Sequence, residues 1–517
     1  MQRESTREKN VLDLFFTNKP GLVKSVHAIP GLSDHDIVMA DCSIKAQINK
    51  QPPRYIHMWS KADWDKIKKE ASNFCQLFLQ NAPNNSVDAN YKTFKNFMEK
   101  VIKDNVPSKL LRSAKKNLPW ITQGIRRMCR KKQRLFNKAK NSHKDKDWKT
   151  YKSLKKDTLK AIRRAHWQYV NNILMDSLEN KDPKPFWRYI KAKKQDVLGV
   201  SPLKVGCNLF SDAKAKATIL NDQFKSVFTE PQEPGPNVPH LEGPKFPSIE
   251  PIEISVQGVQ KLMSRLNVKK ASGPDNVTCR FLRELSIELA PVLRAIFIQS
   301  LDTGEIPEDW SQALVTPIFK KGNRHLASNY RPVSLTSVPC KLLEHIICSH
   351  IRGHLDRYNI LSPLQHGFRG GHSCESQLLL TLQDLMCWRD RKVQVDLAVL
   401  DFAKAFDTVP HESLLGKLNH YGVNNNIHSW IRAFLTHRSQ EVVVDGCKSE
   451  RVSVDSGVPQ GTVMGPLLFL LHINDLPQNV QSTVRLFADD CLLYRPIRSM
   501  EDAVIFQNDL TALEKMG

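Results

Sequence analysis

Three acidic residues lie where apolar segments end, in positions at which a carboxylate is costly to desolvate. Asp401 closes the mostly apolar residues 393–400, and Asp489 and Asp490 are adjacent in the segment FADD at residues 487–490. Desolvated carboxylates need a partner or a metal ion, and Mg²⁺ takes carboxylate and phosphate oxygens as ligands. Two such ions about 3.5–4 Å apart can support an in-line phosphoryl displacement. The acids therefore suggest metal-dependent phosphoryl transfer, although an Asp-Asp pair alone is more typical of a solvated turn.

The elements that would position these acids are a strand and a hairpin. Residues 393–401 predict a buried strand that ends at Asp401, and residues 484–494 predict a hairpin with Asp489 and Asp490 at its tip. Neighbouring side chains point to opposite faces of a regular strand, but at a turn both acids can approach one site. The pattern around them is that of a mixed α/β (α+β) domain. Apolar spacing predicts helices at residues 256–266, 281–301, 341–355 and 375–388, and an apolar segment at 313–319.

A series of motifs stands in a fixed order around the acids and raises the weight of the phosphoryl-transfer interpretation. In chain order the segments are ASGPDN (271–276), PIFKKG (317–322), NYRPVSL (329–335), QHGFRGGHS (365–373), LDFAKAFD (400–407), SGVPQGTVMGPLLF (456–469), INDLP (473–477) and FADD (487–490). This series closely resembles the ordered motifs of LINE-type (non-LTR, jockey-like) retrotransposon reverse transcriptases. The resemblance covers roughly residues 252–517.

The resemblance implies a right-hand polymerase fold with fingers and palm in residues 252–517 and a central antiparallel sheet. It implies RNA-directed DNA synthesis, in which a nucleotide is joined to a primer 3′-OH, with an RNA template, a DNA primer and dNTPs as partners. By the same resemblance, Asp401, Asp489 and Asp490 are the catalytic residues and bind two Mg²⁺ ions, for which Mn²⁺ could substitute. The family's thumb has no counterpart in this chain, so we expect weaker retention of nucleic acid.

The resemblance also assigns nucleotide contacts. Phe406 matches the ring that lies under the sugar of the incoming nucleotide and excludes a 2′-hydroxyl, while ordinary core packing is the alternative for this residue. A planar Arg fork such as that of Arg331 suits phosphate oxygens, and glycine allows close approach of the backbone to a ligand. The matching nucleotide-binding positions are Lys320, Lys321, Arg331, Phe402, Phe406, Gln460 and Gly461.

The segment GFR, which comprises Gly367, Phe368 and Arg369, matches a part of the family motif that contacts the template strand. Packing of the loop is the alternative explanation for these residues.

The beginning of the chain has a second resemblance. Segments NVLDLFFTN (10–18) and GLSDHDIV (31–38) resemble the closing strands of the endonuclease/exonuclease/phosphatase family, so residues 1–45 are interpreted as a remnant of such a domain. In that family the acid and histidine that match Asp34 and His35 act together on the attacked phosphate. The other catalytic residues would lie upstream of this chain, and we therefore expect no nuclease activity.

The formal charge of +23 is concentrated in one segment. Residues 112–194 hold 26 Lys/Arg and 6 Asp/Glu, a difference of 26 − 6 = +20, which is typical of a polyanion-binding surface. A solvated charged face is the alternative, and the aromatic residues in the segment could stack on bases or form the core of a helical bundle. We therefore expect residues 60–228 to form a basic helical region that binds nucleic acid. The seven prolines of residues 229–251 predict a stiff linker.

Eleven cysteines without a CxxC pair indicate a reducing compartment. Residues 1–9 are polar, unlike a signal peptide, and no segment is apolar enough to span a membrane. We expect an intracellular, soluble protein in the nucleus or cytoplasm; the oligomeric state is not predicted. A catalytically inert fragment that only binds RNA is the alternative function.

Overall fold

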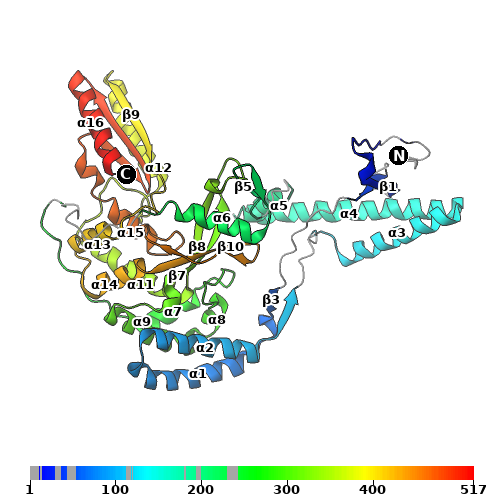
Figure 1. Ribbon diagram of the computed structural model, residues 1–517, viewed down its shortest axis with the longest axis horizontal. Helices are drawn as coiled ribbons and strands as arrows, with labels where there is room; N and C mark the ends of the chain where they lie inside the picture. The colour runs from blue at the N-terminus through cyan, green and yellow to red at the C-terminus, as the bar shows by residue number, and fades with distance from the viewer. Residues whose placement is uncertain are drawn as a thin grey trace. The chain divides into compact units, whose positions relative to one another are not determined.

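The computed structural model describes residues 11, 14–29, 36–43, 54–111, 118, 120–179, 182–193, 199–229, 241 and 243–516. The chain folds into two compact units (Figure 1). One unit comprises Met1–Pro53 and Leu111–Leu198, and the other comprises Arg54–Leu110 and Gly199–Gly517. The region 60–228, expected to be one basic helical domain, is therefore divided between the two units. No helix among the described residues is long and apolar enough to cross a membrane.

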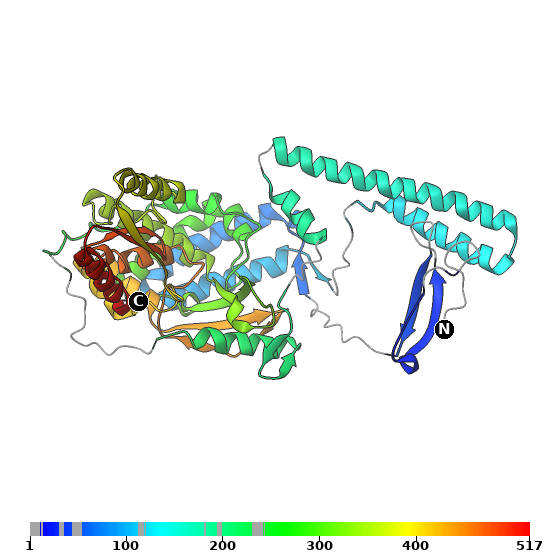
Figure 2. The ribbon, with the colours of Figure 1, turned by 90° about the horizontal axis from the view of Figure 1, so that it is seen from above.

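The first unit contains a two-stranded antiparallel sheet and three helices. Strand β1 (Val23–Ile29) pairs with β2 (Ile37–Cys42). Helix α3 (Gln123–Ser142) and the long α4 (Asp145–Glu179) lie side by side as a helical hairpin (Figure 2), and α5 (Lys184–Lys193) packs on α4. The rings of Phe136 and Tyr151 are buried in this hairpin, whereas Trp167 is 66% exposed. The aromatics of the basic segment are thus divided between core and surface.

The larger part of the second unit is a helical assembly around one apolar core. Its helices are α1 (Trp64–Asn81), α2 (Val87–Asn105), α7 (Val256–Ser264), α8 (Cys279–Glu284), α9 (Ser286–Thr303), α10 (Glu308–Ser311), α11 (Val338–Arg357), α13 (His411–His420), α14 (Asn425–Leu435) and α15 (Gly465–His472). Strands β3 (Arg54–His57) and β4 (Ser108–Leu111) pair beside α1 and α2. The segment 281–301, expected to be one helix, forms α8 and α9 with a break at Leu285, whose backbone leaves the helical region.

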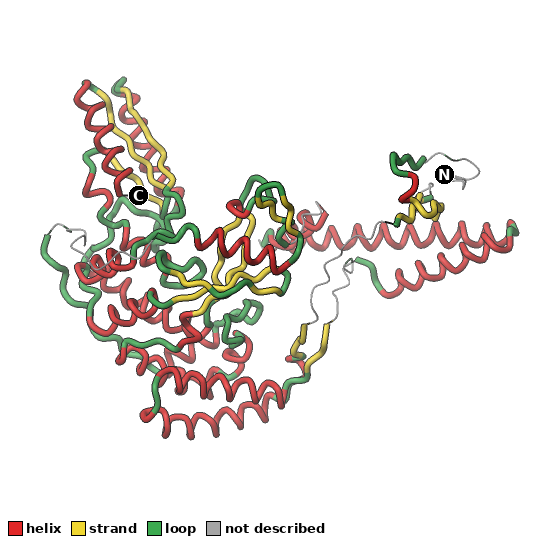
Figure 3. Tube along the Cα trace, in the orientation of Figure 1, coloured by secondary structure: helices red, strands yellow, loops and turns green. Residues whose placement is uncertain are grey.

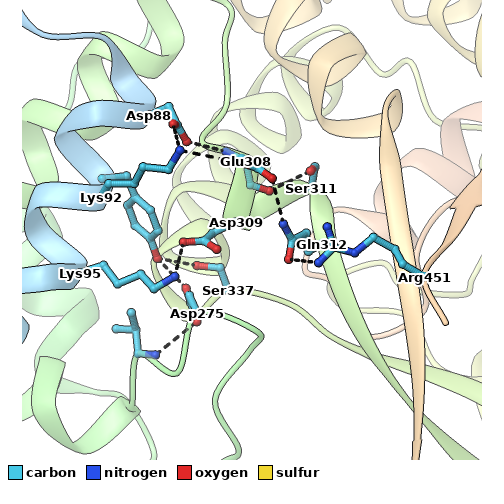
Figure 4. A network of polar contacts seen from close by, with 12 residues as sticks. Asp88, Lys92, Lys95, Asp275, Glu308, Asp309, Ser311, Gln312, Ser337 and Arg451 are labelled. Carbon is cyan, nitrogen blue, oxygen red and sulfur yellow. Dashed lines mark hydrogen bonds and ion pairs between the residues drawn. The ribbon is translucent and has the colours of Figure 1, made fainter. Parts of the chain in front are cut away.

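Helices α1 and α2 belong to this core rather than to a separate nucleic-acid-binding region. Tyr91 on α2 is fully buried, and its hydroxyl donates to Asp275 Oδ2 at 2.5 Å and lies 3.2 Å from Ser337 Oγ. Beside it, Lys95 Nζ is 2.9 Å from Asp309 Oδ2 (Figure 4). Apolar, hydrogen-bonded and ionic contacts together attach the α1–α2 hairpin to α9 and α10.

A five-stranded sheet has the order β11-β10-β7-β8, with β12 also paired to β10. Its strands are β7 (Gln312–Phe319), β8 (Tyr330–Leu335), β10 (Arg438–Val444), β11 (Cys447–Lys448) and β12 (Val452–Val454). Only the β7–β10 pair within it is parallel. Helix α6 (Ala213–Lys225) contributes Leu220 and Phe224 to a small core with Val315 and Val442. The short hairpin β5 (Leu203–Val205) and β6 (Asn208–Phe210) adjoins this core.

A three-stranded antiparallel sheet carries the acids. Its order is β13-β14-β9, with β13 (Thr483–Phe487), β14 (Asp490–Ile497) and β9 (Gln394–Asp401). The expected strand and hairpin are both present, but two details of the expectation are wrong. The strand is not buried, because the face of β9 that carries Leu397 and Val399 is exposed, at 43% and 76%. Asp490 pairs with Phe487 as the first residue of β14, so only Asp489 lies in the turn at the tip. Helix α16 (Met500–Met516) supplies Leu513 to the core on one face of this sheet, and α12 (Cys374–Asp390) contacts β13 and β9. Figure 3 shows both helices in red beside the yellow strands.

The described end of the proline-rich segment is packed against the second unit. The amide of Phe246 donates to the carbonyl of His420 at 3.0 Å, and that of Ile249 to the carbonyl of Gly422 at 2.9 Å. A Cβ on Gly422 would lie 2.0 Å from the carbonyl oxygen of Pro247. Residues 246–249 are therefore part of the fold, whereas residues 230–240 lie outside the described part of the chain.

Candidate functional site

The acidic residues meet at one end of the three-stranded sheet. In the antiparallel pairing of β14 with β9, Asp490 is directly opposite Asp401. Directly opposed residues share a face and have Cβ atoms about 4.5–5.5 Å apart. A two-residue turn, Ala488 and Asp489, joins β13 to β14, and Asp490 follows it as the first residue of β14. Acids 88 and 89 residues apart in the sequence, from 401 to 489 and 490, are thus brought to one place.

The charges that act on Asp490 are negative. The pKa of Asp490 is raised by partial burial and then by the negative charges of Asp489 and Asp401, with no cation among the causes. As they stand, no group of three or more His, Cys, Asp and Glu side chains among the described residues is arranged as a metal site. The acids therefore offer an incomplete set of hard oxygen ligands, and a hard cation such as Mg²⁺ commonly completes its shell with waters and phosphate oxygens.

A cavity of about 710 Å³ opens beside the acids. It is lined by all of the residues for which metal or nucleotide contacts were expected from the sequence. These are Lys320, Lys321, Arg331, Asp401, Phe402, Phe406, Gln460, Gly461, Asp489 and Asp490. They come from both sheets and from the segments that follow β9 and precede α15, so the fold assembles this wall from five separate stretches of chain.

Three of the basic residues that line the cavity belong to the hairpin of β7 and β8, and a fourth, Lys404, follows β9. Arg331 pairs with Ile318 across this hairpin, and the amide of Lys320 donates to the carbonyl of Asn329 at 2.9 Å. Lys320, Lys321 and Arg331 are all exposed. A cavity lined by both cations and carboxylates fits a ligand that carries phosphate groups and a bound cation.

Phe406 both packs in the core and lines the cavity. Its ring stacks on that of Phe469 with centroids 4.4 Å apart and an interplanar angle of 19°. Its carbonyl accepts a hydrogen bond from the amide of Val458 at 2.7 Å. The two roles considered for this residue are therefore compatible, because one face is held by the core while the side chain borders the cavity.

The segment with Gln460 and Gly461 is held tightly against β8. The amide of Ser334 donates to the carbonyl of Gln460 at 2.8 Å. Gly461 has φ +104, and a Cβ there would lie 2.6 Å from the carbonyl oxygen of Ser334. Only glycine satisfies both conditions without strain.

Asp407 is a cavity residue that sequence reasoning missed. Burial raises its pKa to about 6, and Gln460 Nε2 donates to its Oδ1 at 3.4 Å. Asp407 is the last residue of the LDFAKAFD segment, directly after Phe406, and this neighbourhood is a sequence signal that it belongs to the cavity.

Glu344 is a second residue that was missed. It is fully buried on α11, and its Oε2 accepts hydrogen bonds from the amides of Val463 at 2.7 Å and Met464 at 2.9 Å. These amides precede α15, so Glu344 anchors the segment that carries Gln460. An acid within an apolar helix was the available signal, since buried charges are rare without a partner.

The expected template contacts lie beside the acids rather than in the cavity wall. Phe368 has φ 56, is 48% exposed, and its ring meets that of Phe406 edge to face at 6.2 Å. Arg369 Nη1 donates to the carbonyls of Ser362 at 2.7 Å and Gln365 at 3.3 Å. Arg369 thus braces its own loop, as the loop-packing alternative stated. Asp34 and His35 lie outside the described residues.

Comparison with known protein families gives two matches. The model of "Reverse transcriptase (RNA-dependent DNA polymerase)" matches residues 318–516, which include the acids and every residue that lines the cavity. The model of "Female sterile protein K10 C-terminal domain" matches residues 121–185, which form α3, α4 and the start of α5.

Similar proteins are polymerases of insect mobile elements. The chain is 26% identical over 484 residues to the RNA-directed DNA polymerase from mobile element jockey of Drosophila funebris, covering 90% of this chain and 52% of that protein. It is 30% identical over 270 residues to the jockey polymerase of Drosophila melanogaster, covering 50% of this chain and 29% of that protein. The probable polymerase from transposon BS of the same species is 26% identical over 416 residues, which cover 76% of this chain and 45% of that protein.

The chain thus spans about half the length of the first of these relatives. The family match covers the acidic turn, the basic hairpin and the segment between them, and the similarity to the mobile-element polymerases extends over most of the remaining chain. Residues 318–516 thus match the reverse transcriptase family, and the chain as a whole is similar to the polymerases of mobile elements such as jockey.

Proposed function

We propose that the cavity binds a dNTP and joins it to the 3′-OH of a DNA primer on an RNA template. The observation that carries this proposal is the placement of Asp401 opposite Asp490 at a cavity that Lys320 and Arg331 also line. A phosphate-bearing ligand in this cavity would meet both cations and metal-binding carboxylates. The alternative, a fragment that only binds RNA, does not account for this arrangement.

Asp401, Asp489 and Asp490 would hold two Mg²⁺ ions, with Mn²⁺ as a possible substitute. Such ions neutralise the charge that develops on the attacking and leaving oxygens of a phosphoryl displacement. The pKa of Asp490 is raised first by burial and then by the negative charges of Asp489 and Asp401. The clustering of these three acids supports the assignment, because a bound cation would relieve the repulsion. Divalent-metal dependence is general to reverse transcriptases.

The triphosphate would lie against the β7–β8 hairpin. Arg331 can donate two parallel hydrogen bonds to phosphate oxygens, and Lys320 or Lys321 can add a charge-assisted bond. All three are exposed toward solvent in the cavity wall, so binding would not require an existing ion pair to break.

The sugar and base would lie over Phe406, with Phe402, Gln460 and Gly461 beside them. The ring of Phe406 is supported from behind by Phe469, so it cannot easily retreat from a 2′-hydroxyl. This rigidity supports a steric selection of deoxynucleotides. Gly461 lets the chain pass close to the nucleotide, and Gln460 would orient it through its side-chain amide.

The two sheets of the second unit fit the parts of a right-hand polymerase. We assign the β13-β14-β9 sheet, with its acids, to the palm, and the sheet that contains β7 and β8 to the fingers. The template would pass near Gly367, Phe368 and Arg369. Within the other unit, the basic α3–α4 hairpin, with exposed Trp167, would hold RNA, and residues 1–45 would be the endonuclease remnant.

Primer extension on a poly(rA) template with an oligo(dT) primer, dTTP and Mg²⁺ tests the proposal. Asp401→Asn should lower incorporation at least about 100-fold, because it weakens the metal site. Asp396→Asn is the matched control on the same strand, since Asp396 pairs with Arg495 in register and lies away from the cavity. Full activity of Asp401→Asn would refute the assignment. An inactive wild type with salt-sensitive RNA binding would instead support the RNA-binding alternative.

A further inference from the structure

We propose that Gln365 is a positioning residue that holds the turn carrying Asp489, and that it thereby sets how tightly the acidic site binds its metal ions. The inference rests on the proposed polymerase function, which it deepens. Gln365 stands at the beginning of the QHGFRGGHS segment, is only 3% exposed, and does not line the cavity. It acts through the backbone of the turn and not on a substrate.

The side-chain amide of Gln365 forms hydrogen bonds with both the backbone amide and the backbone carbonyl of Ala488, a residue of the turn. Its Oε1 accepts from the amide of Ala488 at 2.9 Å, and its Nε2 donates to the carbonyl of Ala488 at 3.3 Å. Oε1 also accepts from the amide of Gly367 at 2.7 Å. The carboxamide therefore takes the place of a peptide group and pairs with Ala488 as a neighbouring strand would.

Ala488 needs this support because its backbone is in an unfavourable conformation. It has φ 56, a left-handed conformation that is unfavourable for an L-residue because its Cβ approaches the following carbonyl oxygen. Ala488 is also buried, at 7% exposed, so its amide would be expensive to leave without an acceptor. Gln365 supplies the acceptor, and the adjacent Asp489 inherits its position from the turn.

The chain around Gln365 is fixed to the same hairpin. The amide of Leu486 donates to the carbonyl of Leu364, and the amide of His366 donates to the carbonyl of Leu486, both at 3.0 Å. Gly367 fits so closely that a Cβ would lie 2.2 Å from the amide nitrogen of Ala488. The segment from Leu364 to Gly367 therefore forms an extra edge on β13 and ends against the turn.

This contact also joins the acids to the nucleotide side of the site. Immediately after Gly367, Phe368 turns back with φ 56 and places its ring against Phe406. A displacement of the Leu364–Phe368 segment would thus change both the Asp489 turn and the ring beneath the proposed sugar position. A buried glutamine that merely stabilised the fold would have no such selective effect.

Gln377 provides a matched control. It is also buried, and its Nε2 donates to the carbonyls of Leu364 at 2.8 Å and Leu486 at 3.0 Å. It binds the same two segments as Gln365 but not Ala488. Gln365→Leu and Gln377→Leu each remove one buried side-chain amide, from neighbouring places in the fold. Thermal unfolding measures how much stability each variant loses.

The experiment compares the two variants by Mn²⁺ titration and by the Mg²⁺ dependence of primer extension. Gln365→Leu should raise the metal concentration for half-saturation about 10-fold and lower kcat, as expected for a residue that orients metal ligands. Gln377→Leu should leave half-saturation within about 2-fold of wild type at a similar loss of stability. Equal metal affinities of the two variants, with an active wild type, would overturn the inference and leave the polymerase proposal intact.

Hydrogen exchange provides a readout that does not depend on activity. The amide of Ala488 should lose protection in Gln365→Leu and keep it in Gln377→Leu, because only Gln365 accepts its proton. Unchanged protection of the Ala488 amide in Gln365→Leu would show that Gln365 does not hold the turn. If the wild type neither binds Mn²⁺ nor extends a primer, the polymerase proposal fails, and the exchange experiment still decides whether Gln365 holds the turn.

Discussion

The ring of Phe406 stacks on the ring of Phe469, with centroids 4.4 Å apart, so a residue of the cavity wall is supported directly by a residue of the core. Phe469 is 2% exposed and belongs to α15. The support makes the position of the Phe406 side chain a property of the fold and not of the bound nucleotide.

Phe406→Val should therefore weaken the discrimination against ribonucleotides. Removal of the ring opens space for a 2′-hydroxyl, and a single steric contact of this kind is worth roughly 10–200-fold in kcat/KM. The ratio of kcat/KM for dTTP and UTP on the same primer–template measures the effect. Phe469→Leu should weaken the discrimination less, because it loosens the support of the ring but leaves the ring itself in the cavity. An unchanged ratio in Phe406→Val would exclude the steric filter.

Gly461→Ala should destabilise the second unit by about 1–3 kcal/mol. The new Cβ would lie 2.6 Å from the carbonyl oxygen of Ser334, at a φ of +104 that alanine rarely adopts. Gly353→Ala on α11 is the control, since nothing lies within 4 Å of its Cβ position, and alanine favours the helix by up to about 1 kcal/mol. Urea denaturation of both variants tests the contrast. Equal stability of the two would show that the Gly461 segment can move away from β8.

The pH dependence of stability should report the burial of Asp407. Its pKa in the folded chain is raised to about 6, above the value of about 4 expected when unfolded. The folded state then binds the proton more tightly, so this contribution is full below about pH 4 and is lost as the pH rises through 6.

Asp407→Asn cannot ionise and should therefore be more stable than wild type at pH 7.5 by on the order of 1–2 kcal/mol, with little difference near pH 4. Chemical denaturation across this pH range measures the difference. The exposed Asp455 provides a control in Asp455→Asn. If Asp407→Asn were instead less stable than wild type at pH 7.5, the stability difference would have the opposite sign. The folded state would then favour the charged carboxylate, and the prediction would be wrong.

Tyr91→Phe should cost the second unit about 1–3 kcal/mol. The variant removes the hydroxyl that donates to Asp275, a fully buried carboxyl group whose pKa is raised by burial. Tyr55→Phe, at a tyrosine that is 71% exposed, should change stability by less than about 0.5 kcal/mol. If the two variants unfold alike, α2 is not part of the cooperative unit that contains Asp275.

The sequence alone was informative wherever local pattern and chemistry agree. An apolar strand that stops at Asp401 and a hairpin with Asp489 at its tip follow from patterning, and both are present. The expectation that Lys320, Arg331 and Gln460 contact the nucleotide rests on the resemblance carried by the order of motifs. Spacing within one segment could not supply it, since such spacing does not show which distant segments share a cavity.

Contacts between distant segments could not be predicted in this way. The sequence predicts one basic helical region over residues 60–228, but it carries no signal that α1 and α2 pack on α9. Gln365 meets Ala488 across 123 residues, and a lone glutamine carries no signal of that contact. The break at Leu285 depends on how α8 and α9 pack, which local helix propensity does not determine.

The most direct test of the central claim is to locate the metal site on the chain itself. Iron(II) bound in place of Mg²⁺ in the presence of dTTP reduces added hydrogen peroxide to hydroxide and a hydroxyl radical, ascorbate returns the iron(III) to iron(II), and the radicals cut the backbone near the ion. Cleavage should be confined to the neighbourhood of Asp401 and of Asp489 and Asp490, should be suppressed by excess Mg²⁺, and should disappear in Asp489→Asn. Cuts at other places, or cuts that persist in Asp489→Asn, would contradict the assignment of these carboxylates to one metal-binding site.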